Sequence, residues 1–208
     1  MAKQEQKTEK RADKLIGRRY RYTADYQVVP ALGPDGGSGK RVVYIGKWIL
    51  PRCGEAGYSR LVPALWILTG FAVLAVLIAA QILPPPMEHK WYLPVLMISV
   101  FPLAYQVMGA FRLPARKKPM ERQRYDKSFV RVGHSALFVF VLICAALLGD
   151  AAYWIVRACG ALAGSASYSL RDGLFVLLLV LAAGAEFAAY RLFRTIQTDT
   201  LENSAYQP

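Results

Sequence analysis

Glu186 is the residue of this chain whose type and position can support chemistry most directly, because it is acidic and lies inside a long apolar run. The run DGLFVLLLVLAAGAEFAAYRLFR, from Asp172 to Arg194, is long enough to cross a hydrocarbon core about 30 Å thick as one helix. A charged side chain that faces lipid at that depth costs about 3 kcal/mol or more. We therefore expect Glu186 to face protein or water, or to carry a proton.

Other polar side chains fall at the same depth in the apolar runs of the chain. Thr69, Gln106 and Glu186 each lie six to eight residues from the nearer end of their run, which is roughly 9–12 Å along a helix axis. Polar groups in hydrocarbon seek each other, because no water is available there. The sequence thus predicts one polar layer that holds these three residues, with Tyr105 and Tyr190 nearby.

Two interpretations of this layer remain open. In the structural one, Glu186 is protonated or accepts a hydrogen bond, and it holds the helices together. In the functional one, Glu186 is a proton or cation site in a transport path. The first is favoured, because a transporter usually has more polar groups within the membrane and internal repeats.

A second polar pair is predicted near the opposite membrane boundary. Asp150 and Arg157 are seven residues apart and share one helix face, so we expect a partly hydrated ion pair, with Arg171 or Lys90 as alternative partners of Asp150.

No known catalytic or metal-binding motif appears. Cys53, Cys144 and Cys159 lack the spacing of a disulfide framework or a zinc site, and His89 and His134 fall on opposite sides of the predicted membrane. The stretch GPDGGSGK lacks the spacing of a phosphate-binding loop. We therefore expect no metal and no cofactor, and the sequence gives no indication of an enzyme.

Four apolar runs position these side chains, in a chain that is 55% hydrophobic with a mean hydropathy of +0.26. They predict an all-α membrane domain at 61–194, a bundle of four transmembrane helices at about 61–83, 91–111, 134–157 and 172–194. The first run begins at Leu61, too late for a cleaved leader. Small residues spaced four apart, Gly184/Ala188 and Ala185/Ala189, predict close helix packing.

Residues 1–60 are predicted to form a cytoplasmic segment with a short helix at 2–17 and a β-hairpin at about 19–50. Alternation places a row of aromatic side chains on one face: Tyr20, Tyr22, Tyr26, Tyr44 and Trp48. A lone hairpin is marginally stable in water, so this face needs a partner. The alternatives are the chain's own cytoplasmic loop, its N-terminal helix, the membrane surface, a second protomer or another protein. Residues 195–208 are polar and expected to be a disordered tail.

The basic residues predict the orientation. Of 26 lysines and arginines, 23 lie in residues 1–60, 112–131 and 191–194, which the positive-inside rule assigns to the cytoplasm together with both termini. This distribution favours contact with anionic lipid headgroups rather than with nucleic acid. We expect a multi-pass protein of a bacterial plasma membrane.

The predicted function is a non-enzymatic interaction or accessory subunit of a membrane assembly, with a protein partner or a homo-oligomer. The alternative is a small oligomeric transporter or channel component that uses Glu186 as a proton or cation site.

Overall fold

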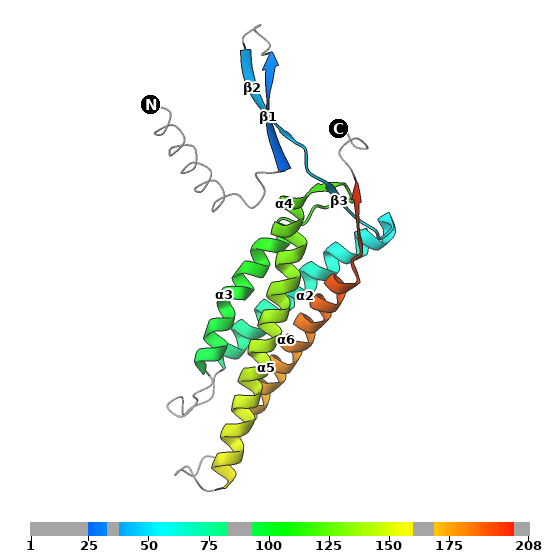
Figure 1. Ribbon diagram of the computed structural model, residues 1–208. Helices are drawn as coiled ribbons and strands as arrows, with labels where there is room; N and C mark the ends of the chain where they lie inside the picture. Colours follow the sequence, from blue (N-terminus) through cyan, green and yellow to red (C-terminus); the bar gives the residue numbers. More distant parts are fainter. Residues whose placement is uncertain (1–24, 33–37, 83–92, 160–168, 202–208) are drawn as a thin grey trace, which may run out of the picture. The chain divides into compact units, whose positions relative to one another are not determined.

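The computed structural model describes residues 25–32, 38–82, 93–159 and 169–201, and it is mainly helical with small sheets (Figure 1). The chain forms two compact units. The strand unit takes its residues from 1–50, 119–125 and 198–208, and the helical unit comprises residues 51–118 and 126–197.

The helical unit contains four long helices: α2 (Glu55–Gln81), α3 (Leu93–Ala110), α5 (Arg131–Ala158) and α6 (Leu170–Thr195). A π-helical turn, η3 (Asp126–Val130), leads into α5. Helix α5 packs against α3 and α6, and α2 packs against α6 (Figure 1). All four are long and apolar enough to cross a membrane, as is typical of a multi-pass membrane protein, and the four predicted helices are confirmed.

Helices α2, α5 and α6 begin before the apolar runs that predicted them, whereas α3 is shorter than its run. Helix α2 begins at Glu55, six residues before the predicted start at Leu61, because hydropathy marks only the apolar part of a helix. Tyr58 in this extension is buried, and its hydroxyl donates to the Pro114 carbonyl at 2.8 Å. Helix α6 begins at a capping box in which Ser169 and Asp172 bond each other's main chain.

Small side chains let the helices approach closely. Ala185 and Ala189 are buried in α6, as predicted. At Gly133 in α5, an added Cβ would lie 2.2 Å from the Phe193 ring of α6. The prediction is wrong at Gly184, which is exposed and has open space around its Cβ position, because it lies on the outer side of α6.

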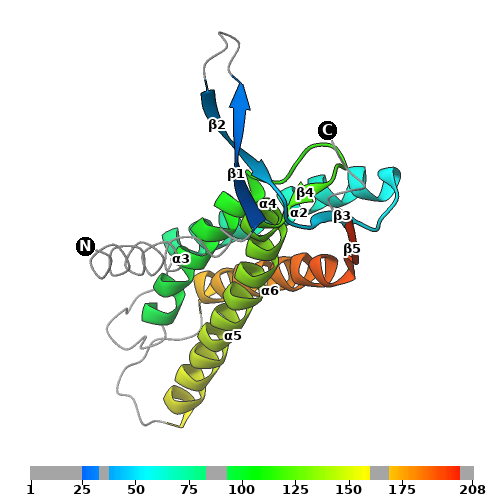
Figure 2. The ribbon, with the colours of Figure 1, turned by 45° about the horizontal axis from the view of Figure 1, so that its top comes forward.

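The strand unit contains the predicted hairpin, formed by β1 (Tyr26–Leu32) and β2 (Ser38–Tyr44). These strands are antiparallel, with Tyr26 opposite Tyr44 and Val28 opposite Val42. A second sheet places β3 (Trp48–Pro51) between β4 (Met120–Glu121) and β5 (Thr198–Leu201), as Figure 2 shows. The short helix α4 (Arg122–Tyr125) follows β4.

Two predictions for these segments are wrong. The second hairpin strand does not continue to residue 50, because the main chain turns at Gly46, whose N–H bonds the Asp25 carbonyl at 3.1 Å. An added Cβ at Gly46 would lie within 2.8 Å of Asp25, so glycine suits this turn. The tail was expected to be disordered, but residues 198–201 form β5, because they pair with β3.

Several predicted features lie outside the described residues. These are the N-terminal helix at 2–17, Tyr20, Tyr22, His89 and the hairpin turn at 33–37.

Candidate functional site

Three helices of the helical unit each contribute one polar side chain to a buried layer. Thr69 comes from α2, Gln106 from α3 and Glu186 from α6, and all three are buried. They stand among apolar and small residues, and Gln106 and Glu186 are among the largest fully buried side chains. Burial of this kind is costly unless hydrogen bonds satisfy the polar atoms.

The amide of Gln106 joins the layer. Its Nε2 donates to Thr69 Oγ1 at 3.1 Å and to Glu186 Oε2 at 2.9 Å. These bonds connect residues that are 37 and 80 positions apart in the chain. The structure therefore brings together the three residues that the depth count placed in one layer.

Two oxygen atoms of the layer are left without a hydrogen bond in the described structure. They are Oε1 of Gln106 and Oε1 of Glu186, and both are buried. Each is an acceptor, so the layer lacks a donor. An unsatisfied buried polar atom is uncommon in folded proteins and calls for an explanation.

The two predicted tyrosines do not belong to this layer. Tyr105 is 48% exposed, and the Arg131 guanidinium lies 4.0 Å from its ring centroid. The Tyr190 hydroxyl lies 3.5 Å from Nη1 of Arg194. The ring of His134 packs edge-on against Phe193 instead of reaching the carboxyl of Glu186.

At the opposite end of α5, the predicted pair is described only in part. Asp150 is buried, and Nη1 of Arg157 donates to the Tyr153 hydroxyl at 2.8 Å. The Arg157 guanidinium also lies 5.5 Å from the ring of Trp154. The ion pair between Asp150 and Arg157 stays a prediction.

The aromatic face of the hairpin begins with an ordered cluster in the strand unit. Rings of Tyr26 and Tyr44, and of Tyr44 and Trp48, meet edge to face with centroids 5.1 Å apart. Such pairs contribute about 0.5–1.5 kcal/mol beyond their buried area. Tyr44 is buried, so this end of the hairpin is packed.

The loop between α3 and α5 provides the partner of this cluster. The Tyr26 hydroxyl donates to Glu121 Oε2 at 2.7 Å, and the Arg122 amide donates to the Tyr44 hydroxyl at 3.1 Å. Burial and the Glu121 carboxylate raise the pKa of Tyr26, and burial raises the pKa of Tyr44. Of the alternatives left open by the sequence, the chain's own loop is therefore a partner of Tyr26 and Tyr44.

Beyond this packed end, the next two residues of β1 are exposed. Val28 follows Tyr26 on the same face and is 58% exposed, and Gln27 is exposed on the other face. Within the described residues, β1 and β2 pair only with each other. Both strands thus present an outer edge that can accept hydrogen bonds from another strand.

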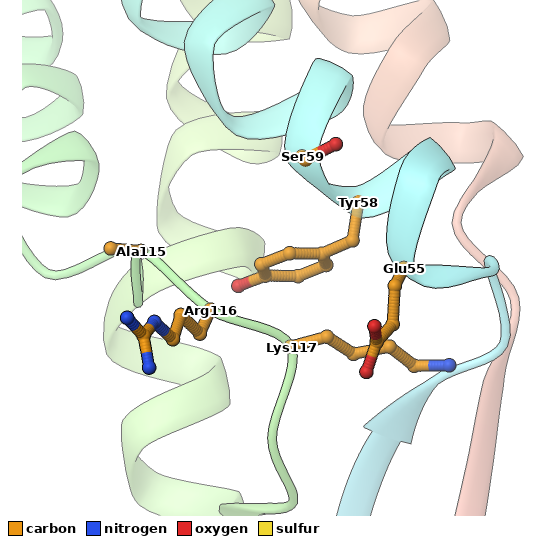
Figure 3. Close-up of a pocket in the computed structure, with 6 residues that line it drawn as sticks. All are labelled: Glu55, Tyr58, Ser59, Ala115, Arg116 and Lys117. Atoms are coloured by element: carbon orange, nitrogen blue, oxygen red, sulfur yellow. The ribbon is translucent and has the colours of Figure 1, made fainter.

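A cavity that the sequence reasoning missed lies beside the first turn of α2. It has a volume of about 250 Å³. Figure 3 shows the Tyr58 ring extending from α2 toward the segment that contains Ala115. The cavity is lined by Glu55, Tyr58, Ser59, Ala115, Arg116 and Lys117. The basic run from Arg116 to Lys118 was the one signal for it in the sequence.

No group of histidine, cysteine, aspartate and glutamate side chains in the described part of the chain is arranged to hold a metal ion. Comparisons of the chain with protein-family models, with curated proteins and with solved structures find no match.

Proposed function

We propose that this chain is a non-enzymatic accessory subunit of a membrane assembly, in which the helical unit is the anchor and the strand unit binds a partner protein. The observation that carries the proposal is the exposed stretch of β1 at Gln27 and Val28. Its packed end is fixed by Glu121 and Arg122, whereas Val28 is exposed and both outer edges are unpaired in the described structure. A partner strand can add to such an edge through main-chain hydrogen bonds.

The sheet of the strand unit supports a membrane topology in which both termini share one side. In the sequence, strand β3 precedes α2, strand β4 lies between α3 and α5, and strand β5 follows α6. Strands can pair only on one side of a bilayer, so an even number of crossings must separate them. This requirement is met when each of the four helices crosses once.

The proposed side is the cytoplasm of a bacterial cell, and the proposed membrane is the plasma membrane. The segments that contain the paired strands also hold most of the 26 basic residues, which supports a cytoplasmic location. Arg116 and Lys117 line the cavity beside α2. We assign them to anionic lipid headgroups, which attract a basic residue near the surface by about 1 kcal/mol.

Site-specific crosslinking tests the proposed interaction. A photoreactive residue at position 28 should link a stoichiometric partner in membranes, and the substitution Val28→Asp should reduce that complex at least about tenfold, which corresponds to about 1.4 kcal/mol. Gln27→Asp is the matched control, because it adds the same charge at an adjacent exposed position on the other face. Recovery of the full-length chain without any partner linked at position 28 would contradict the proposal.

A second candidate function is a small oligomeric transporter or channel component that uses Glu186 as a proton or cation site. The unpaired oxygens of Gln106 and Glu186 favour it. Proton or cation flux in proteoliposomes that is lost in Glu186→Gln, with assembly retained, would support this candidate over the accessory role.

A further inference from the structure

We infer that the buried layer is a proton-binding site, in which a neutral Glu186 carboxyl donates from Oε1 to Oε1 of Gln106. Together with the bond from Gln106 Nε2 to Glu186 Oε2, this contact makes a reciprocal acid–amide pair between α6 and α3. The inference does not rest on the accessory role proposed above.

A count of donors and acceptors leads to the proton. The Gln106 amide has two N–H hydrogens, and both are engaged, one with Thr69 and one with Glu186. The two Oε1 atoms remain unpaired, and no hydrogen bond reaches either of them from the Thr69 hydroxyl. One proton on Glu186 supplies the missing donor and satisfies both atoms at once.

A charged carboxylate does not fit the same surroundings. Glu186 is fully buried, and the structure gives it one hydrogen bond, from an uncharged amide. Three titratable side chains of the neighbouring helices and of α6 make other contacts: Tyr105 with Arg131, Tyr190 with Arg194, and His134 against Phe193. A buried charge without a paired partner costs several kcal/mol, on the order of the whole stability margin of a domain.

A metal cation fits less well than a proton. Hard divalent cations take about six or more oxygen ligands. The three side chains of the layer offer four oxygens in the described structure, namely the two unpaired ones and the two that accept from Gln106 Nε2. A proton needs one donor position and one acceptor, and both are present.

Asp172 provides a contrast within the same helix. One of its oxygens, Oδ2, accepts from the Ser169 amide at 2.9 Å and from the Ser169 hydroxyl at 2.6 Å. It also lies in the first turn of α6, where the helix dipole favours negative charge. Asp172 is thus a buried carboxylate whose surroundings stabilise the ionised form, and it is a matched control for Glu186.

Infrared spectroscopy of the full-length protein in lipid at neutral pH tests the inference. We expect the carbonyl band of a protonated carboxylic acid in the wild type, its loss in Glu186→Gln and its retention in Asp172→Asn. Gln106→Leu should shift the band rather than remove it, because the carboxyl then loses its hydrogen-bond partner. A wild-type spectrum in which Glu186 contributes only a carboxylate band would overturn the inference.

Two further readouts keep the test decisive if a variant folds poorly. A hydrophobic carbodiimide, which reacts with protonated carboxyls, should modify Glu186 and not Asp172 in the wild type, as mapped by mass spectrometry. In thermal unfolding, the Glu186→Gln variant should keep an unfolding temperature close to that of the wild type, because the amide can reproduce both hydrogen bonds. The Glu186→Ala variant should unfold at a lower temperature. An equal decrease of the unfolding temperature in the two variants would contradict the reciprocal pair.

Discussion

At the residue scale, the Tyr26 hydroxyl links β1 to the loop between α3 and α5. Its 2.7 Å bond to Glu121 spans 95 positions of sequence. Replacing Tyr26 by Phe should destabilise the strand unit by about 1 kcal/mol, since it removes one hydrogen bond to a carboxylate and retains the ring contacts with Tyr44. We expect amide hydrogen exchange in β1 and β2 to be faster in the Tyr26→Phe variant than in the wild type.

The same bond has a defined pH dependence. The pKa of Tyr26 is raised in the folded chain by burial and by Glu121, relative to an ordinary value of about 10. The neutral phenol is therefore the stabilising form, and its contribution is present below about pH 10 and is lost as the pH rises through the folded value. The difference in exchange between wild type and Tyr26→Phe should be constant near neutral pH; a difference that vanishes there would contradict this assignment.

At the residue scale, the sequence is informative about geometry that the helix itself fixes. The rise per residue placed Thr69, Gln106 and Glu186 at one depth, and the hydrogen bonds of Gln106 join them. Glu121 was not predicted as the partner of Tyr26, because no local pattern specifies a contact across two intervening helices. Tyr105 lies outside the layer because of how α3 is rotated about its own axis. Depth along the helix does not determine this rotation.

At the element scale, helices α5 and α6 approach closely because Gly133 has no side chain. A Cβ at this position would overlap the Phe193 ring at 2.2 Å. Gly133→Ala should therefore destabilise the helical unit by about 1–3 kcal/mol, since the ring or the helices must move. Thermal unfolding in detergent would measure the change.

Gly184 of α6 is the matched control, because a Cβ there would meet no atom within 4 Å. Gly184→Ala should leave the stability unchanged or raise it by up to about 1 kcal/mol, through the better helix propensity of alanine. If both alanine variants unfold at the same temperature, the close approach at Gly133 does not contribute to stability.

The existence of the helices was predictable from hydropathy, and their ends were not. Helix α6 starts at Leu170, two residues ahead of the predicted start at Asp172, because Ser169 and Asp172 form a capping box there. Strand β5 could not be read from the polar residues 198–201, because its stability comes from pairing with β3 rather than from its own sequence pattern.

At the scale of the whole molecule, the chain returns to one sheet after each pair of helices. Strand β3 precedes the first pair, β4 separates the two pairs, and β5 follows the second. The basic residues predict that the three segments lie on one side of the membrane, but no sequence pattern indicates that these segments pair. The proposed accessory role depends on this arrangement, since a partner can reach the hairpin only from the side where the strand unit lies.

The most direct test of the membrane arrangement uses cysteines that the chain already contains. Cys53 lies two residues before α2 and is half-buried, and Cys159 directly follows α5 and is exposed. We would retain one of them at a time and treat bacterial spheroplasts with a membrane-impermeant maleimide. We expect labelling of Cys159 in intact spheroplasts, and of Cys53 only after the membrane is permeabilised. Labelling of Cys53 before permeabilisation would contradict a cytoplasmic strand unit and, with it, the proposed site of partner binding.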